Sequence, residues 1–237
     1  MKRFILLSIL YTLFNLDVLS QIGAFRRDLA VGINGGYAFN QVSFSPNVNQ
    51  VMHGGITIGA TVRYTCEKYF SMICALQGEI NYAQLGWTED ASAAADICSY
   101  SYKRHMNYIQ MPLLVNLGFG KERGGVKGFI VAGPHLGFCL GDKEVKDGDW
   151  NNADLSPRLR ELHNNKPIEK TFDYGITMGL GMDVSTKNGH HFTLEGRYGL
   201  SLSNIFSSSK QDTFGRSANN VITVKVSYLF DVLKTRN

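Results

Sequence analysis

The sequence predicts an all-β fold, because long segments alternate strictly between large apolar and small polar residues. The clearest case covers 172–184 and 191–202, where every second side chain except that of Gly196 is large and apolar and the positions between are mostly Gly, Thr, Ser or paired charges. A period of two marks extended strands, whose successive side chains point to opposite faces. Asn188-Gly189 lies between the two segments and supplies the positive-φ residues of a tight hairpin turn.

Two further observations indicate that these strands cross a membrane. The segments exceed the five or six residues of a typical strand and approach the length of about 9–11 residues that a tilted strand needs to cross a bilayer. Their polar face is poor in Lys and Glu, although a face in water would be rich in both. A face of small residues suits the crowded interior of a narrow barrel, so the apolar face is expected to point outward into lipid.

The same alternation occurs eight times along the chain. The predicted strands are 29–39, 54–65, 70–86, 105–119, 127–140, 172–184, 191–202 and 219–231. An even number of strands places both chain ends on one side, as in single-chain bacterial barrels. The sequence therefore predicts an eight-stranded antiparallel up-and-down transmembrane β-barrel.

The connections between these strands alternate in length. Those after the second, fourth and sixth strands are short, and those after the first, third, fifth and seventh are long. The long connections are 40–53, 87–104, 141–171 and 203–218. Short turns at one rim and long loops at the other are typical of outer-membrane barrels, with the turns in the periplasm and the loops outside the cell.

Two local features accompany this pattern. Ser156-Pro157 has the residue types of an N-cap and a first helical position, which predicts a short helix over 158–162. Tyr and Phe residues, together with Trp87, gather near the strand ends and predict the aromatic girdles that mark the two membrane interfaces.

The first twenty residues have the form of a secretory signal peptide. Met1-Lys2-Arg3 is basic, 4–14 is an apolar run, and Val18-Leu19-Ser20 offers small residues before Gln21. We therefore expect a signal peptide over 1–20 and one barrel domain over 21–237. The alternative is an uncleaved anchor, which would need about 20 apolar residues.

Composition argues against several classes of function. A formal net charge of +4 on 237 residues is too mild to predict a nucleic-acid partner. The four cysteines have no metal-ligand spacing, and neither a metal nor a cofactor is expected. They are Cys66, Cys74, Cys98 and Cys139. Export permits disulfides, and the pair to test is Cys98 with Cys139, which would lie at the same end of the barrel; the disulfide state of the four stays open.

Six charged residues fall in phase with the inward face of the strands. They are Arg63, Glu79, Asp183, Glu195, Arg197 and Lys225. Three are acidic and three are basic, and a buried charge without a partner would cost several kcal/mol. The balanced set therefore predicts a paired, structural network in the lumen. A path for protons or solutes is the alternative, although an eight-stranded barrel has room for little beyond its own side chains.

Enzymatic activity is not predicted. Ser101 and His105 near the outer rim are the best candidates for a nucleophile and a base, but no Ser-His-acid spacing accompanies them. The Gly-rich segment 32–36 lies within a strand with no helix after it, so a phosphate-binding loop is not expected. A soluble lipocalin-like barrel would have to hold roughly 40 large apolar side chains, too many for so small an interior.

Five segments together resemble a known family. They are 80–86, 106–114, 132–137, 172–176 and 194–198. In this order they resemble successive landmarks of the PorT-like outer-membrane β-barrel family, over most of the chain from about residue 29 to residue 231. The sequence departs from the family in its long fifth connection and in residues 231–237 beyond the last strand. Because of this C-terminal extension, Phe230 is the expected aromatic residue of the C-terminal assembly signal.

The resemblance implies an eight-stranded barrel in the bacterial outer membrane, with no catalytic or cofactor-binding residue to carry over. The founding member of the family takes part in type IX protein secretion. We therefore expect a structural or accessory role, as a subunit of a secretion or translocation complex. The expected partners are outer-membrane lipid, lipopolysaccharide and proteins of such a complex. The alternatives are a small porin-like channel and, less favoured, a lipid-modifying enzyme.

Overall fold

The computed structural model describes residues 24–69, 71–89, 100–121, 123–148, 166–207 and 214–234. Within these ranges every regular element is a β-strand, and all strand pairings are antiparallel. The strands are β1 (Ala24–Ser45), β2 (Gln50–Val51), β3 (His53–Tyr69), β4 (Met72–Glu89), β5 (Tyr100–Gly120), β6 (Gly125–Gly148), β7 (Phe172–Ser185), β8 (His190–Ser201) and β9 (Arg216–Leu233). Nowhere in the described ranges is there a helix long and apolar enough to span a membrane.

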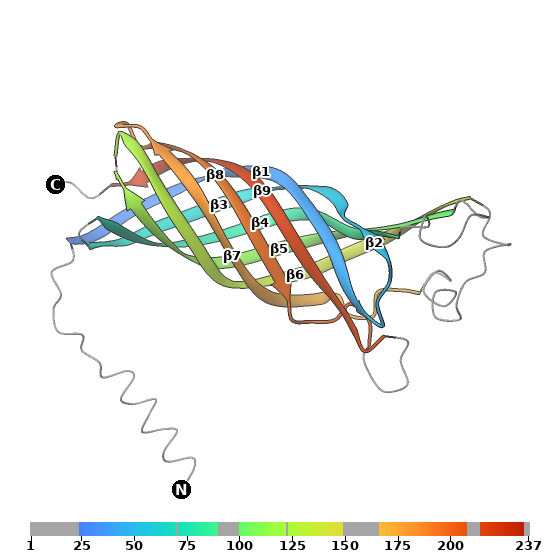
Figure 1. The fold of residues 1–237 in the computed structure, drawn as a ribbon. Helices are drawn as coiled ribbons and strands as arrows, with labels where there is room; N and C mark the ends of the chain where they lie inside the picture. Colours follow the sequence, from blue (N-terminus) through green and yellow to red (C-terminus); the bar gives the residue numbers. More distant parts are fainter. Residues whose placement is uncertain are drawn as a thin grey trace, which may run out of the picture.

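The eight long strands form one closed sheet. Their order is β4-β3-β1-β9-β8-β7-β6-β5, and β5 pairs back onto β4. Strands that follow one another in sequence are neighbours in space, and β9 returns to β1 with Tyr37 opposite Val224. Figure 1 shows the resulting cylinder of tilted strands, which is an antiparallel β-barrel. The short β2 adds only two residues beside the end of β4.

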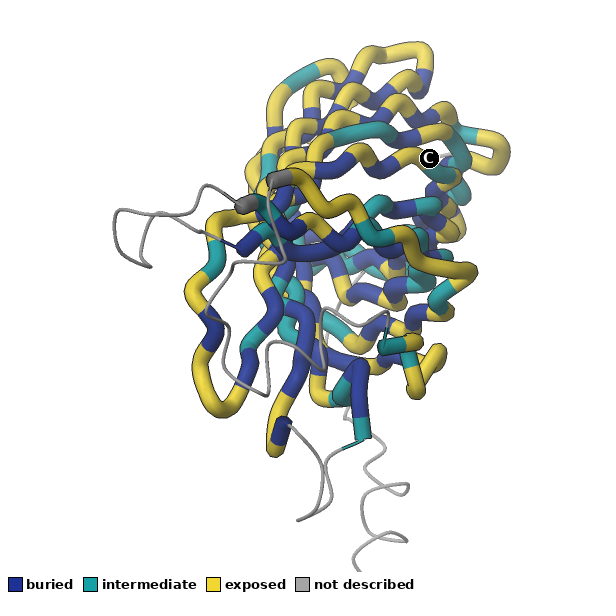
Figure 2. Tube along the Cα trace, turned by 90° about the vertical axis from the view of Figure 1, so that its right-hand side faces the viewer, coloured by how far each residue is buried: buried dark blue, intermediate teal, exposed yellow. Residues whose placement is uncertain are grey.

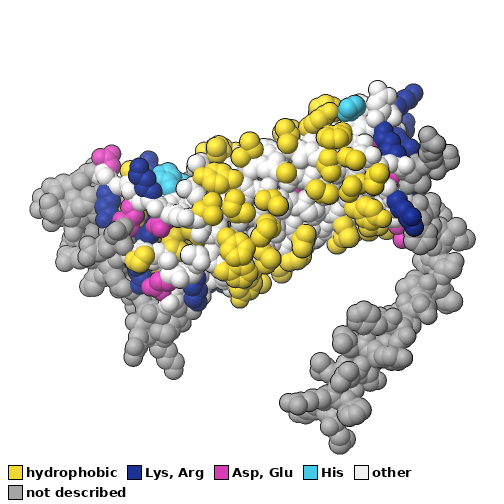
Figure 3. All heavy atoms as spheres, turned by 180° about the vertical axis from the view of Figure 1, so that it is seen from behind, with side chains coloured by type: hydrophobic (Ala, Val, Ile, Leu, Met, Phe, Trp, Pro, Cys, Tyr) yellow, Lys and Arg dark blue, Asp and Glu magenta, His cyan; other side chains and the backbone are white. Residues whose placement is uncertain are grey.

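Side chains alternate between the inside and the outside of this cylinder. In β7 and β8 each exposed apolar residue is followed by a buried or half-buried one, and Figure 2 shows the same alternation along the other strands. Leu194 and Tyr198 are exposed, whereas Glu195 and Arg197 between them are buried. The exposed apolar side chains form a band around the barrel (Figure 3), far larger than a soluble monomer presents.

Aromatic side chains lie at both edges of this band. Near the loop end, Phe138 and Phe172 pack with their ring centroids 5.0 Å apart, and near the turn end Phe192 and Tyr228 are 5.1 Å apart. Trp87, which the sequence placed in a girdle, is instead fully buried inside the barrel. Its inward position follows from the two-residue period of β4, because Trp87 lies an even number of residues after the inward-facing Glu79.

Several strands extend beyond their predicted limits. The largest difference is in β5 and β6, which pair as far as Tyr100 and Gly148, although the sequence predicted ends near 105 and 140. The apolar residues stop near Leu140 because the hairpin leaves the lipid there. A register shift at this point moves the alternation by one residue, because Asn107 lies opposite Gly141 but Tyr108 lies opposite Cys139. Beyond it the alternation resumes in charged form, with Asp142 and Glu144 turned toward Arg104 inside.

Three predictions lie outside the described residues. They are the signal peptide over 1–20, the helix over 158–162, and the pairing of Cys98 with Cys139. Within the described ranges Cys66, Cys74 and Cys139 are free thiols.

The outward position of Leu194 gives a direct test of which face meets lipid. We expect Leu194→Arg to lower the yield of folded protein in lipid vesicles, because Leu194 faces lipid two residues inside the aromatic Phe192, where an arginine costs about 1–2 kcal/mol. Gln41→Arg is the matched control, since Gln41 is exposed on β1 beyond the aromatic Phe39. Equal folding yields for the two variants, measured by the mobility of unheated samples in detergent gels, would contradict the assigned facing.

Candidate functional site

A charged network crosses the middle of the barrel interior. Arg197 on β8 donates from Nη1 and Nη2 to the two carboxylate oxygens of Glu79 on β4, at 2.9 and 2.7 Å. Lys225 on β9 donates to Glu79 at 2.5 Å, and Glu195 accepts two bonds from Arg197 at 2.7 and 2.8 Å. Neither β8 nor β9 adjoins β4 in the sheet. These bonds therefore tie opposite walls together through the lumen.

Amide side chains complete the shell around the Glu79 carboxylate. Gln77 and Asn81, two residues away on either side, donate to its oxygens at 2.8 and 2.9 Å. Asn34 on β1 donates to Asn81 at 2.9 Å, and Asn116 on β5 donates to Gln77 at 3.1 Å. Two cations and two amides thus donate to Glu79 and offset the cost of burying its charge.

A second charged cluster lies nearer the turn end. Asp183 on β7 contacts Arg63 at 2.9 Å, Lys127 at 3.3 Å and His191 at 3.2 Å. The other ring nitrogen of His191 lies 3.1 Å from Asp231. All five side chains are largely buried, and they come from β3, β6, β7, β8 and β9.

The six residues expected to form one lumen network thus fall into two clusters. Glu79, Glu195, Arg197 and Lys225 form the first, and Arg63 with Asp183 forms part of the second. The sequence reading did not include Lys127, His191 and Asp231. The two-residue period of the strands could have identified them. Each lies an even number of residues from an inward-facing residue of its own strand: Lys127 from Val131, His191 from Glu195, and Asp231 from Lys225.

The loop end of the interior is filled by apolar side chains. This apolar plug consists of Ala38, Val42, Phe44, Val48, Ala83, Leu85, Trp87, Tyr102, Met106, Tyr108, Ile205, Phe206, Phe214 and Val221. Its rings pack edge to face: the ring centroids of Phe44 and Phe206 lie 5.4 and 6.4 Å from that of Trp87. Phe206 and Phe214 come from the two described ends of the connection between β8 and β9, and both side chains are buried in the lumen. Residues outside the strands carry no strand period, so the sequence did not predict the part of the plug that Ile205, Phe206 and Phe214 supply.

Arg104 anchors the plug to the extended β5–β6 hairpin. Its guanidinium is fully buried and lies 5.6 Å from the centroid of the Trp87 ring. It donates hydrogen bonds to Asp142 at 2.7 Å and to Glu144 at 2.8 Å. A third bond, of 2.6 Å, goes to the carbonyl oxygen of Lys166. Tyr102, which lies beyond the lipid-facing band, donates to Glu144 at 2.8 Å. Burial raises the pKa of the Tyr102 hydroxyl, and its bond to Glu144 acts in the same direction, so Tyr102 stays a neutral donor.

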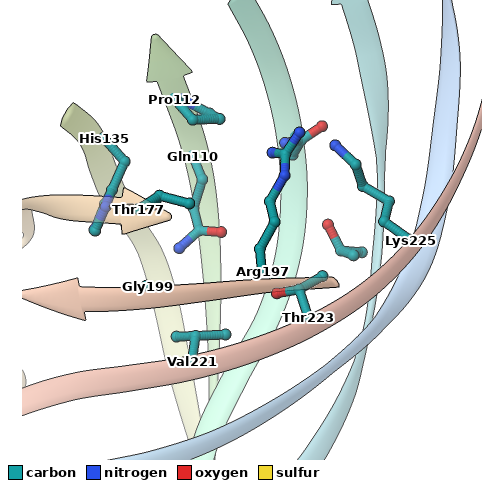
Figure 4. A pocket seen from close by; sticks show the side chains of 11 residues that line it. Gln110, Pro112, His135, Thr177, Arg197, Gly199, Val221, Thr223 and Lys225 are labelled. Carbon is teal, nitrogen blue, oxygen red and sulfur yellow. Dashed lines mark hydrogen bonds between the residues drawn. The ribbon is translucent and has the colours of Figure 1, made fainter. Parts of the chain in front are cut away.

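Between the first network and the plug lies a small polar cavity (Figure 4). It measures about 40 Å³. Arg197 and Lys225 line one side, and His135, whose Nδ1 is 2.9 Å from the Thr177 hydroxyl, lies on the other. A water molecule needs about 10–15 Å³ on this measure, so the cavity holds about three. A second, smaller pocket of about 20 Å³ lies at the turn end beside the Asp183 cluster, where Arg63, Lys127 and His191 line it.

The candidates for catalysis and metal binding lie apart from these clusters. Ser101 and His105 pair with Asp147 and Lys143 across the β5–β6 hairpin, and the His105 ring packs edge-on against His53 with centroids 4.7 Å apart. Among the described residues, no group of three or more His, Cys, Asp or Glu side chains is placed to hold a metal ion.

Comparison with known proteins places this architecture in context. A family model described as "Outer membrane protein beta-barrel domain" matches residues 19–207. The outer membrane protein OprG from Pseudomonas aeruginosa is 10% identical, with a TM-score of 0.49 over 88% of this chain and 97% of that one. The attachment invasion locus protein Ail of Yersinia pestis is 12% identical, with a TM-score of 0.35 over 85% and 98% of the two chains. No curated protein matches the sequence significantly.

Proposed function

Because the chain belongs to the outer membrane protein beta-barrel domain family and resides in the bacterial outer membrane, we propose that it has a structural or accessory role there. It acts as a subunit of a larger assembly, such as a secretion or translocation complex. Its contribution is a rigid membrane-spanning wall and a loop-end surface that protein partners bind. The proposal includes no catalytic step and no cofactor.

The observation that carries this proposal is the filled interior. Glu79, Arg197 and Lys225 tie opposite walls together in the middle of the barrel, and the apolar plug fills the loop end. A barrel built to pass solutes needs a continuous wet path, and the cavity between these two layers measures only about 40 Å³. This arrangement favours a role exercised through outer surfaces over a porin-like role.

The loop-end surface is large enough to serve as a platform. The β5–β6 hairpin continues as far as Tyr100 and Gly148, well beyond the last lipid-facing residue of β6, Leu140. Figure 1 shows it projecting from one end of the barrel. Arg104 ties this projection to the plug and so keeps it in a defined orientation for a partner.

Conductance tests the choice between accessory subunit and channel. In planar bilayers the purified protein is expected to show no steady ion conductance, because the charged network and the plug leave no continuous water path. Phe206→Ala with Phe214→Ala is the informative comparison, since it thins the plug but leaves the Glu79 network in place. Steady conductance from the unmodified protein would refute the accessory role in favour of the channel.

Co-purification tests the assembly itself. A tagged chain extracted from native outer membranes under mild detergent is expected to retain one or more protein partners in fixed stoichiometry. A variant that combines Ser101→Arg with Asp147→Arg alters the outer face of the projection beyond the Arg104 ion pairs and is expected to lose them. A chain that always purifies alone, even after chemical cross-linking in the membrane, would exclude the proposed role.

A further inference from the structure

Basic side chains gather on the outer face of the β5–β6 hairpin, directly above the lipid-facing band. Lys103, His105 and Lys143 lie on this face, with His105 directly opposite Lys143 and Lys103 opposite Val145. Directly opposed residues in an antiparallel pair have Cβ atoms about 4.5–5.5 Å apart. The two lysines are exposed and His105 is half-buried, so the three side chains present their nitrogens to one small area.

The height of this area matches the headgroup layer of the outer leaflet. On β6 the last lipid-facing side chain is Leu140, which is 62% exposed, and Lys143 lies three residues further along the strand. At about 3.4 Å per residue and a tilt of about 45°, Lys143 is roughly 7 Å above Leu140. The headgroup region adds roughly 5–7 Å to each side of the hydrocarbon. Figure 3 shows basic and histidine side chains at this edge of the apolar band.

A fourth nitrogen group lies behind these three. His53 is 5% exposed, its Nδ1 lies 3.1 Å from the Thr88 hydroxyl, and its ring packs edge-on against His105. Its Nε2 is buried and has no hydrogen-bond partner among the described residues. A buried polar group without a partner costs about 1–3 kcal/mol, and an anionic oxygen that reaches Nε2 when the His105 ring turns aside would supply the missing partner.

The backbone is shaped to admit the His53 ring. Gly86 on β4 lies against it, and a Cβ at Gly86 would be 3.0 Å from His53 Cδ2 and 1.9 Å from the carbonyl oxygen of Arg104. Any larger residue would push the ring away from His105. The absence of a side chain at residue 86 therefore permits the close approach of the two histidines.

Nearby carboxylates are turned away from this face. Asp142 and Glu144, which alternate with Lys143 along β6, point inward and bind Arg104. The next acid on the outer face is Asp147, which pairs with Ser101 beyond the cluster. The outer face at the level of the headgroups is consequently basic, and its counter-charge must come from outside the hairpin.

From this placement we propose that Lys103, His105, Lys143 and His53 form a binding site for the phosphate group of an outer-leaflet glycolipid. The acyl chains of the bound lipid lie along Ile109, Phe138 and Leu140 below it. The two ammonium groups neutralise the phosphate charge, and the imidazoles donate hydrogen bonds to its oxygens. The site fixes the depth and rotation of the barrel in the membrane, independently of any protein partner.

Native mass spectrometry of the folded full chain in detergent tests this site. The probe is a diphosphorylated lipid A, compared with the same lipid after enzymatic dephosphorylation and with inorganic phosphate alone. Unmodified protein is expected to retain the phosphorylated lipid and to lose it when Lys103→Gln and Lys143→Gln are combined. Each lysine at a membrane surface is worth about a fivefold change in binding, so the expected loss is roughly 25-fold.

The matched control combines Lys170→Gln with Arg216→Gln, which removes two exposed charges at the same end but from other segments. It is expected to retain the lipid. Equal losses in the two double variants would show unspecific attraction and overturn the proposal. So would equal retention of the dephosphorylated lipid, or inorganic phosphate binding as tightly as lipid A. His105→Gln, which keeps both lysines, gives an intermediate loss and serves if the double variant fails to fold.

Discussion

Arg197→Leu is expected to lower the free energy of unfolding of the barrel by about 3–5 kcal/mol, the usual cost of removing one partner from a buried ion pair. Arg197 supplies four of the hydrogen bonds in the central network, two to Glu79 and two to Glu195. Without it Glu79 keeps Lys225, Gln77 and Asn81, whereas Glu195 loses both of its bonds to Arg197. The loss therefore arises mainly at Glu195.

A double variant separates this cause from a simple packing defect. Adding Glu195→Leu to Arg197→Leu removes the stranded carboxylate, so we expect the pair to recover part of the lost stability. Urea unfolding in detergent, followed by tryptophan fluorescence, measures each change. Lys143→Gln on the outer surface is the control and is expected to stay within about 0.5 kcal/mol of the unmodified protein. Additive losses at residues 195 and 197 would contradict the paired network.

The membrane-spanning part of the fold could be predicted because lipid and lumen impose opposite demands on alternate residues. Leu194 and Arg197 differ by three positions, so strand parity alone assigns them to opposite faces, and their exposures agree with that assignment. The same two-residue period also determines where Trp87 lies. Trp87 shares the phase of Glu79, and this places it inside the barrel, not in a girdle.

Other parts of the structure depend on contacts that no local pattern encodes. Glu79 meets Arg197 from a strand that is not its neighbour, so the split into two charged clusters required the closed three-dimensional register. Phe206 and Phe214 lie in a connection without strand periodicity, and only the folded chain shows that they fill the lumen. The extension of β6 past Leu140 was hidden because the apolar signal ends where the strand leaves the lipid.

Arg104→Met is the second substitution with a large expected effect, and it acts on the loop end alone. Methionine keeps the apolar contact with Trp87 but leaves Asp142 and Glu144 facing the plug without the guanidinium that they share. Both carboxylates keep some contact with water, so the loss is expected to be about 1.5–3 kcal/mol. Because the Glu79 network and the lipid-facing strands are untouched, we expect this loss to open the plug while the rest of the barrel stays folded.

Hydrogen exchange measured by mass spectrometry distinguishes such local opening from global unfolding. Peptides that contain Trp87, Tyr102 and Phe206 are expected to exchange faster in Arg104→Met, whereas those of the membrane-spanning β7 and β8 are expected to keep their protection. Lys146→Gln is the matched control, because Lys146 lies 3.4 Å from Glu144 but is exposed, and such a pair is worth at most about 1 kcal/mol. Faster exchange throughout the barrel would mean that Arg104 supports the whole fold. No change at all would mean that the aromatic packing holds the plug without Arg104.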